Sequence, residues 1–249
     1  MQPPIFYASP QAINDGLITL DSRESHHAVK VLRLKVGSLV LVVDGLGSAY
    51  RGEIIKLGAG KKVLVKAFTS LRNFGEPNVI ITLAGGLSTG HKFDTLVEKG
   101  TELGVKRLVP LITEKSKVKI DDYKKAKAKQ ARYEKIALSA MKQCRRAYRP
   151  EISLPVTFST YLEEIDDDAL NLIFHPDKSG ESLYNLKTDK NIKRINIIVG
   201  PESGFSDKEI ELSIKKGLLP ITLGDRILRT ENAGPVICGI LMYLSGELR

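Results

Sequence analysis

Short apolar runs separated by glycine-containing turns occupy residues 17–68. The runs SLVLVVDG, AYRGEIIKLG and KKVLVKAF are rich in β-branched residues and follow one another at regular spacing. Short strands in this arrangement indicate a small barrel or sandwich. Residues 70–78 combine Gly, Pro and Asn without apolar periodicity, which is typical of a linker. We therefore expect two domains, residues 1–72 and residues 73–249.

Longer apolar runs follow this boundary, with helical patterns between most of them. They read VIITLAGGL, RLVPLI, NLIFH, INIIVG and PITLG. Near-continuous apolar strands that alternate with helices are typical of a parallel sheet covered by helices on both faces. The second domain is therefore predicted to be α/β, with about five strands.

Three helix signals accompany these strands. Residues 123–146 carry an apolar stripe at helical spacing, opposite a side made mostly of lysine and arginine. Ser206 and Glu209 have the spacing of a capping box at a helix start. Asn232 is expected to cap the last helix, with Pro235 in its first turn, where the missing N–H does little harm.

The net charge of +9 is unevenly distributed. Residues 1–72 hold 10 Lys and Arg against 5 Asp and Glu, and residues 106–149 hold 15 against 4. Clustered basic residues gain affinity for polyanions by releasing counterions from phosphates. The lysines of KKAKAKQARYEK could instead be only the solvated face of a long helix. The second basic excess, in residues 1–72, favours an RNA partner.

Composition disfavours several classes of protein. The chain is 42% hydrophobic and 27% charged, and no run approaches the ~20 apolar residues of a membrane span. The start, MQPPIFYASPQ, lacks the basic and apolar regions of a secretory signal. Cys144 and Cys238 are expected to be free thiols, and the scattered histidines have no zinc-ligand spacing. We therefore expect a cytoplasmic protein without a metal or a membrane anchor.

Two glycine-containing loops are the most informative part of the second domain. Residues 197–211, IIVGPESGFSDKEIE, and residues 223–233, LGDRILRTENA, each follow an apolar strand and lead into a helix. Both loops should lie at the carboxyl edge of one sheet, where open α/β sheets bind ligands. Gly200, Gly204 and Gly224 permit positive φ and a close approach of a ligand. Such a turn can also be a simple tight connection, but two together predict a small-molecule pocket.

These loops, together with HHAVKVLRLKVG at residues 26–37 and TELGV at residues 101–105, resemble one known family in the same chain order. That family is RsmE, the small-subunit (16S) ribosomal RNA uridine-N3 methyltransferases of the SPOUT superfamily. The resemblance implies a SPOUT-type α/β domain with a parallel sheet and a trefoil knot, preceded by a small PUA-like RNA-binding β-barrel. It also implies a homodimer that uses S-adenosyl-L-methionine (SAM) to methylate ribosomal RNA within the small subunit.

The resemblance assigns residues to the cofactor and to RNA. Three chain segments would surround SAM: Phe174, His175, Val199, Gly200, Pro201, Glu202, Gly204, Leu223, Gly224, Ile227 and Leu228. An ordinary histidine at a strand end is the alternative for His175. Candidates for RNA binding are Lys30, Arg33, Arg145 and Arg146. Lys30 and Arg33 would share one face of a short helix, whereas the two arginines could equally serve the dipole of the long helix.

Arg229 and Glu231 are the catalytic candidates. A guanidinium beside the cofactor loop can hold a phosphate or stabilise a uridine deprotonated at N3. Glu231 is a candidate general base or orienting partner, and a salt bridge between the two residues is the structural alternative. Ser203 and Asn232 stand where the family commonly has glycine and threonine, which leaves the effect of these changes open.

Other functions remain compatible with the chain. One is a related methyltransferase that acts on transfer RNA or large-subunit ribosomal RNA. Another is a non-catalytic RNA-binding assembly protein that keeps the pocket. A nucleotide-binding hydrolase is disfavoured because the phosphate-loop lysine motif is missing. The sequence specifies neither the uridine that is modified, nor whether free RNA or the assembled subunit is the substrate, nor the group that removes the N3 proton.

Overall fold

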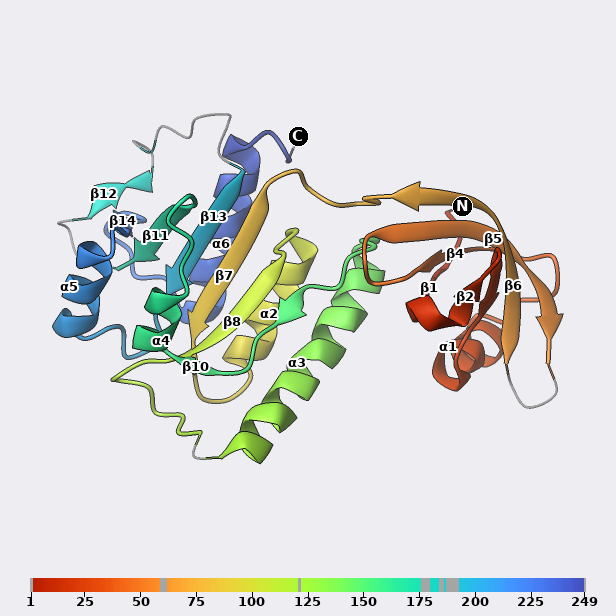
Figure 1. The fold of residues 1–249 in the computed structure, drawn as a ribbon, viewed down its shortest axis with the longest axis horizontal. Helices are drawn as coiled ribbons and strands as arrows, with labels where there is room; N and C mark the ends of the chain where they lie inside the picture. Colours follow the sequence, from red (N-terminus) through yellow and green to blue (C-terminus); the bar gives the residue numbers. More distant parts are fainter. Residues whose placement is uncertain are drawn as a thin grey trace. The chain divides into compact units, whose positions relative to one another are not determined.

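The computed structural model describes residues 2–58, 62–120, 122–175, 180–183, 186 and 193–248. The chain divides into two compact units. The first contains Met1–Glu76 and Leu138–Arg149, and the second contains Pro77–Ala137 and Pro150–Arg249 (Figure 1). The first unit thus ends a few residues after the expected boundary at 72/73, and it includes a later segment that we expected in the second domain.

A six-stranded sheet forms the first unit, in the order β1-β4-β5-β6-β3-β2. The strands are β1 (Ile5–Tyr7), β2 (Ile13–Asn14), β3 (Leu17–Thr19), β4 (Leu39–Val43), β5 (Ser48–Leu57) and β6 (Val63–Arg72). Strands β1 and β4 pair in parallel, and the other neighbouring strands of this sheet are antiparallel. Phe6, Ile18, Val42 and Ile54 are completely buried in the core of this sheet. This is the small β-rich domain that the spacing of short strands predicts.

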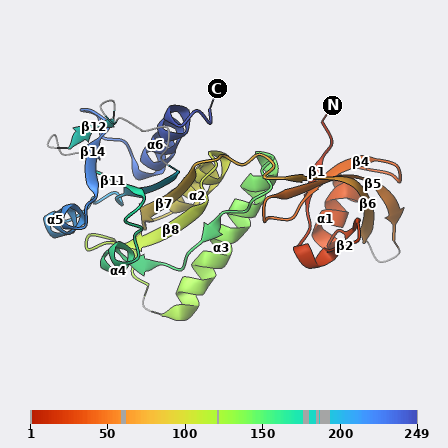
Figure 2. The same ribbon diagram turned by 45° about the horizontal axis from the view of Figure 1, so that its top comes forward.

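Short helical segments accompany this sheet. They are η1 (Pro10–Ala12), α1 (Ser22–His26) and the π-helical turn η2 (His27–Val31), with α1 drawn beside the strands in Figure 2. The long helix α3 (Tyr123–Gln143) confirms the predicted helix at residues 123–146, and its last residues belong to the first unit. There Met141, together with Ala147, is completely buried among residues of β4 and β5. This packing explains why Leu138–Arg149 joins the first unit.

Parallel strands form the sheet of the second unit, in the order β10-β8-β7-β13-β11-β14-β12, with β9 paired to β8. The strands are β7 (Ile80–Gly86), β8 (Arg107–Ile112), β9 (Glu151–Ile152), β10 (Val156–Thr157), β11 (Leu170–Phe174), β12 (Glu181–Ser182), β13 (Arg194–Val199) and β14 (Leu219–Thr222). The five longer strands are the five apolar runs of the sequence, so the predicted parallel sheet is confirmed. The three strands of two residues are too short to leave a periodic pattern.

Helices cover both faces of this sheet (Figures 1 and 2). Helices α2 (Lys92–Glu102), α3 and α6 (Thr230–Leu244) pack on one face, and α4 (Phe158–Glu163) and α5 (Asp207–Lys215) pack on the other. Consecutive residues of β7 pack on opposite faces of the sheet. Leu83 belongs to the core beneath α2, α3 and α6, and Ala84 belongs to the core beneath α4 and α5. Side chains point alternately to the two faces of a strand, so both faces must be apolar.

The starts of the last two helices test the sequence signals. Ser206 and Glu209 form the predicted capping box at the start of α5. The expected cap at Asn232 is wrong, because α6 begins at Thr230 with Arg229 as its N-cap. The backbone N–H of Asn232 already donates to the carbonyl of Arg229 at 2.9 Å, within the first turn. The trefoil knot implied by the resemblance stays a prediction.

Candidate active site

Neighbouring parallel strands bring the candidate site together by ending at one edge of the sheet. Val199, the last residue of β13, pairs with Gly85 of β7 on one side and with Phe174 of β11 on the other. The loops that follow therefore begin side by side. A Cβ at Gly86 would lie only 2.3 Å from Cδ and N of Pro201. Glycine at this position therefore lets the loop after β13 pack against the end of β7.

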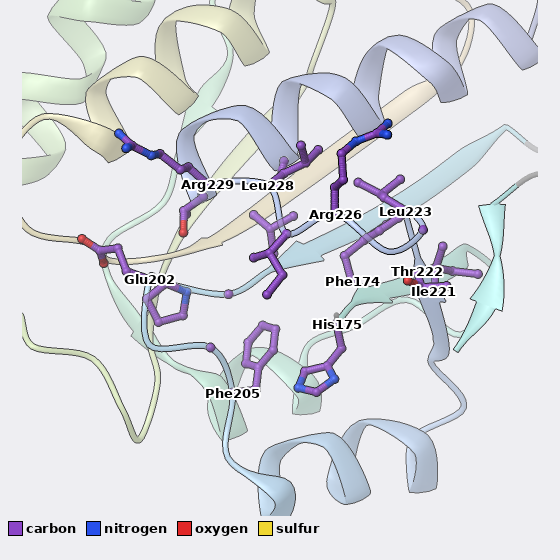
Figure 3. A pocket seen from close by; sticks show the side chains of 18 of the residues that line it. Phe174, His175, Glu202, Phe205, Ile221, Thr222, Leu223, Arg226, Leu228 and Arg229 are labelled. Carbon is purple, nitrogen blue, oxygen red and sulfur yellow. The ribbon is translucent and has the colours of Figure 1, made fainter. Parts of the chain in front are cut away.

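These loops surround a cavity of about 420 Å³, which is within the usual range of small-molecule sites. Its wall comes from the end of β11, the loop between β13 and α5, and the segment from β14 into α6, with one residue from α2 (Figure 3). All the residues that the resemblance assigns to the cofactor lie on this wall, as does Arg229. The wall is formed by Lys92, Phe174, His175, Val199, Gly200, Pro201, Glu202, Gly204, Phe205, Ile221, Thr222, Leu223, Gly224, Arg226, Ile227, Leu228, Arg229, Thr230 and Ala233.

Several wall residues are absent from the prediction. Most of them, such as Phe205 and Thr222, are neighbours in sequence of residues that we did predict. Lys92 is different, because it opens α2 and belongs to the connection that follows β7. The apolar run VIITLAGGL predicts β7, and the rule that ligands bind at carboxyl strand ends could have pointed to this connection. No motif in the sequence marks the lysine itself.

The glycines of the two loops have different roles. Gly204 and Gly224 adopt φ values of 67° and 93°, as predicted, and a Cβ at either position would meet no atom within 4 Å. Gly200 does not have a positive φ; instead, a Cβ there would lie 3.2 Å from the ring of Phe205. Ser203 does not have a positive φ either, and its hydroxyl donates to a backbone carbonyl at 2.6 Å. A serine at this position is therefore compatible with the loop.

One end of the cavity carries a charged pair. Nζ of Lys92 donates to Oε1 of Glu202 at 2.6 Å, and the hydroxyl of Thr89 donates to the same oxygen at 3.2 Å. Desolvation acts to raise the pKa of Glu202, but hydrogen bonds from Lys92, from its own backbone and from Ser88 lower the pKa to about 2. Glu202 is therefore a carboxylate at neutral pH. Figure 3 shows Glu202 and Arg229 at one end of the cavity, with His175 and Thr222 towards the other.

The two catalytic candidates differ in position. Arg229 lies on the cavity wall, and its side chain forms no ion pair with any residue that the structure describes. Glu231 does not line the cavity. Its Oε2 is buried and has no hydrogen-bond partner among the described residues. No salt bridge joins Arg229 to Glu231, so the structural alternative for this pair is not observed. The geometry favours Arg229 over Glu231 for a direct role at the cavity.

The two candidates for RNA binding near the N-terminus, Lys30 and Arg33, are exposed, but not on one helical face. Lys30 is exposed in η2, whereas Arg33 lies beyond this turn with φ of 54°. The expectation that the two share a helix face is therefore wrong, because the helix ends between them. Both side chains are nevertheless open to solvent beside the exposed apolar residues Val31 (60%) and Val36 (59%). His27 is instead partly buried, with its ring 5.8 Å from that of Phe6.

Arg146 is a structural residue in this fold, in contrast to its expected contact with RNA. Its side chain is 3% exposed and that of Glu76 is 6% exposed. Nη2 donates to Oε2 of Glu76 at 2.7 Å and Nε donates to Oε1 at 3.3 Å, while the backbone N–H of Tyr148 donates to Oε1 at 2.9 Å. Arg145 is partly exposed, with Nη1 donating to the carbonyl of Pro3 at 3.1 Å. Arg145 therefore remains the RNA candidate of the two.

Two further observations concern partners of other kinds. Among the described residues, no three His, Cys, Asp or Glu side chains gather as a metal site would require. In the same part of the chain, every helix is too short or too polar to cross a lipid bilayer.

Cys144 and Cys238 are free thiols, as predicted, and burial raises the pKa of Cys238 to about 12.

Comparison with protein families gives a separate match for each of the two parts of the chain. The family described as "RNA methyltransferase domain" matches residues 75–242. The family described as "RNA methyltransferase PUA domain" matches residues 20–68. The first match contains every residue on the cavity wall, and the second contains Lys30 and Arg33.

Individual relatives extend the likeness over nearly the whole chain. Ribosomal RNA small subunit methyltransferase E of Buchnera aphidicola subsp. Acyrthosiphon pisum is 33% identical over 235 residues, which cover 92% of this chain and 89% of the relative. The crystal structure of ribosomal RNA small subunit methyltransferase E from Neisseria gonorrhoeae bound to SAM has a TM-score of 0.87, with 26% identity and 98% of each chain covered. A Legionella pneumophila protein solved with bound SAM has a TM-score of 0.86 at 30% identity, again with 98% of each chain covered. The chain therefore belongs to the RNA methyltransferase family, in the group of the ribosomal RNA small subunit methyltransferase E proteins.

Proposed function

We propose that this protein is an enzyme that transfers a methyl group from SAM to N3 of a uridine in small-subunit ribosomal RNA. The cavity at the carboxyl edge of the second sheet is the observation on which this proposal rests. The Neisseria relative, which shares this fold, was solved with SAM. The first unit supplies exposed basic residues for RNA, and the second supplies the site of the reaction. Because its substrate is ribosomal RNA, we expect the protein in the cytoplasm.

The cavity has the properties that an adenosyl cofactor needs. Phe174, Val199, Leu223 and Leu228 give one part of the wall an apolar surface on which a purine ring can pack. Gly204 brings its backbone to the cavity without a side chain in between. When bound, SAM supplies an electrophilic methyl group, so the protein needs mainly to hold the donor and the acceptor in line. The residues present therefore fit this cofactor.

Arg229 is proposed to act on the RNA rather than on the cofactor. Its guanidinium is exposed on the cavity wall and free of ion pairs with the described residues, so it can hold a phosphate or stabilise negative charge on the uridine. We expect Arg229→Ala to abolish methyl transfer while SAM affinity, measured by calorimetry, stays nearly unchanged. Wild-type turnover of this variant would exclude Arg229 from the mechanism. Glu231 is retained as a positioning candidate only, because it does not line the cavity.

The substrate can be tested directly. Purified small-subunit RNA, large-subunit RNA and transfer RNA, all from cells that lack this protein, are incubated with the enzyme and radiolabelled SAM. The proposal requires label in small-subunit RNA alone, in one methyluridine identified by mass spectrometry. Label in another RNA would favour a related methyltransferase. Binding of RNA without binding of SAM would favour a non-catalytic assembly protein.

A second copy of this chain is the partner that we propose for the outer face of α6. Val236 and Tyr243 are 41% and 68% exposed on this face. Gly239 lies between them, and a Cβ there would meet no atom within 4 Å, so packing within the chain does not require a glycine. Glycine in a helix costs roughly 0.5–1 kcal/mol, but it lets another helix approach closely. Light scattering should therefore give the mass of a dimer, and Gly239→Leu with Val236→Glu should give that of a monomer.

A further inference from the structure

The charged pair of Lys92 and Glu202 joins the connections that follow two neighbouring strands of the sheet. Lys92 follows β7 and Glu202 follows β13, and these two strands are neighbours paired in register up to Gly85 and Val199. The two side chains are only about one-third exposed, at 33% and 32%. Thr89 adds a hydroxyl to the same carboxylate oxygen at 3.2 Å. Lys92 and Glu202 thus place a hydrogen-bonded pair of charges on the wall of an otherwise mostly apolar cavity.

The hydrogen-bonding capacity of this pair has a defined pattern. Because the pKa of Glu202 is lowered to about 2, its side chain only accepts hydrogen bonds at neutral pH. The ammonium of Lys92 has three N–H donors, and its bond to Glu202 uses one of them. A ligand at this end of the cavity therefore meets an acceptor directly beside a donor. The complementary ligand carries an N–H next to a carbonyl oxygen.

We propose that Lys92 and Glu202 read the imide edge of the target base, with Glu202 accepting a hydrogen bond from N3–H and Lys92 donating to the adjacent carbonyl oxygen. This inference rests on the proposed function, since it concerns the base that is methylated there. As the N3–carbon bond forms, the bond from the methyl carbon to sulfur breaks and its electron pair stays on sulfur. The N3 proton is released directly to solvent water, because the carboxylate of Glu202, with its pKa lowered to about 2, is too weak a base to take it.

The same pair selects uridine against cytidine. N3 of cytidine carries no proton and is an acceptor, so it would face the carboxylate of Glu202 without a hydrogen atom between them. The neighbouring amino group is a donor and would face the ammonium of Lys92. Both contacts are repulsive, and a mismatched pair of this kind discriminates on the order of 10- to 100-fold. The selectivity of the enzyme for uridine should therefore depend on these two side chains.

The test uses the full-length enzyme and a small-subunit RNA that lacks the methyl group. Glu202→Gln and Lys92→Met are compared with wild type for kcat and KM on this RNA, and for SAM affinity by calorimetry. We expect kcat to fall roughly 100-fold in each variant, because Lys92→Met loses the donor that stabilises negative charge on the base and Glu202→Gln loses the carboxylate that positions N3. SAM affinity should change less than about threefold in both. Lys92→Arg keeps a donor and should retain most of the activity.

A matched control is available on the same helix. Lys99 also lies in α2, is 43% exposed and pairs with Glu102 at 2.9 Å, but it does not line the cavity. Lys99→Met should therefore leave kcat, KM and SAM affinity at wild-type values. Circular dichroism and thermal melting verify that each variant is folded. Replacing the target uridine by cytidine in the RNA should slow the reaction of wild type on the order of 10- to 100-fold, and the uridine preference should shrink in Glu202→Gln.

Three results would overturn this inference. Unchanged kcat in Glu202→Gln would remove the pair from the reaction. A loss of SAM affinity equal to the loss of activity would mean that the pair holds the amino and carboxylate groups of SAM instead. An unchanged preference for uridine over cytidine would exclude the role in base reading. The proposed function fails in a different way, namely if wild type binds SAM but methylates none of the RNAs.

Discussion

Replacing Arg146 by methionine should destabilise the first unit by about 3–5 kcal/mol. This cost arises because the substitution leaves the carboxylate of Glu76, which is 6% exposed, without its charged partner. The remaining hydrogen bond from the backbone N–H of Tyr148 cannot neutralise a buried charge. At roughly 4–8 °C per kcal/mol for a unit of this size, the melting temperature of the first unit should fall by roughly 12–40 °C.

A double variant distinguishes the loss of stability caused by an unpaired buried charge from the loss caused by altered packing. Arg146→Met combined with Glu76→Leu removes both charges and fills the space with apolar side chains, and such replacements are often neutral or stabilising. We therefore expect the double variant to recover most of the lost stability. Because the chain has two units, urea unfolding is followed by two probes, one reporting on each unit. Arg145→Met is the control, since Arg145 is partly exposed and forms no ion pair with the described residues.

The same variants separate a structural role from RNA binding. A residue that contacts a phosphate lowers the slope of log affinity against log salt by about 1 when it is removed. Under conditions where Arg146→Met is folded, this slope should equal that of wild type. A destabilisation below about 1 kcal/mol, in the range of an exposed salt bridge, would refute our reasoning about burial. A reduced salt slope would restore Arg146 as an RNA contact.

Three further predictions concern the cavity and the basic surface. Gly86→Ala places a Cβ 2.3 Å from Pro201 and should lower stability by about 1–3 kcal/mol and weaken SAM binding in calorimetry; an unchanged SAM affinity would show that the loop does not need this contact. Lys30→Met and Arg33→Met should each reduce the salt slope of RNA binding by about 1 without changing SAM affinity, and unchanged slopes would exclude this surface as the RNA site. The folded pKa of Glu202, about 2, lies below its ordinary value of 4.5, so the stability that this carboxylate contributes is fully present above about pH 4.5 and is lost as the pH falls towards 2. Urea unfolding of wild type and Glu202→Gln should therefore differ by a constant amount from pH 7 to about 5 and by less at pH 3, and a difference that grows on acidification would contradict the sign of this shift.

The sheet and the cavity could be predicted because their signals are local. Each long strand of the second unit is one apolar run, and each loop on the cavity wall leaves such a run through a glycine. The rule that carboxyl strand ends share one edge then brings the loops together before any contact is known. The capping box of Ser206 and Glu209 was equally accessible, since its two residues are three apart.

The residues that the sequence analysis assigned wrongly or missed depend mainly on contacts between positions far apart in the sequence. Arg146 looks like one more basic residue at the end of a basic helix, and only the fold places Glu76 beside it. Lys92 and Glu202 are 110 residues apart, so neither residue signals the other. The misplaced cap at Asn232 has a different cause. An arginine is a poor N-cap by propensity, and the carbonyl of Arg229 nevertheless accepts the first helical hydrogen bonds.

Because Leu138–Arg149 folds with the first unit, a single cut after Glu76 does not divide this protein into two exchangeable domains. A fragment that starts at Pro77 would keep Met141 and Ala147 but lose the strands that bury them, and both side chains are 0% exposed in the intact chain. A fragment that ends at Glu76 would lack the same two side chains from its interior, and Glu76 would lose its arginine. Engineered hybrids with other methyltransferases therefore have to exchange this short segment together with the N-terminal residues, as two pieces of sequence that fold as one.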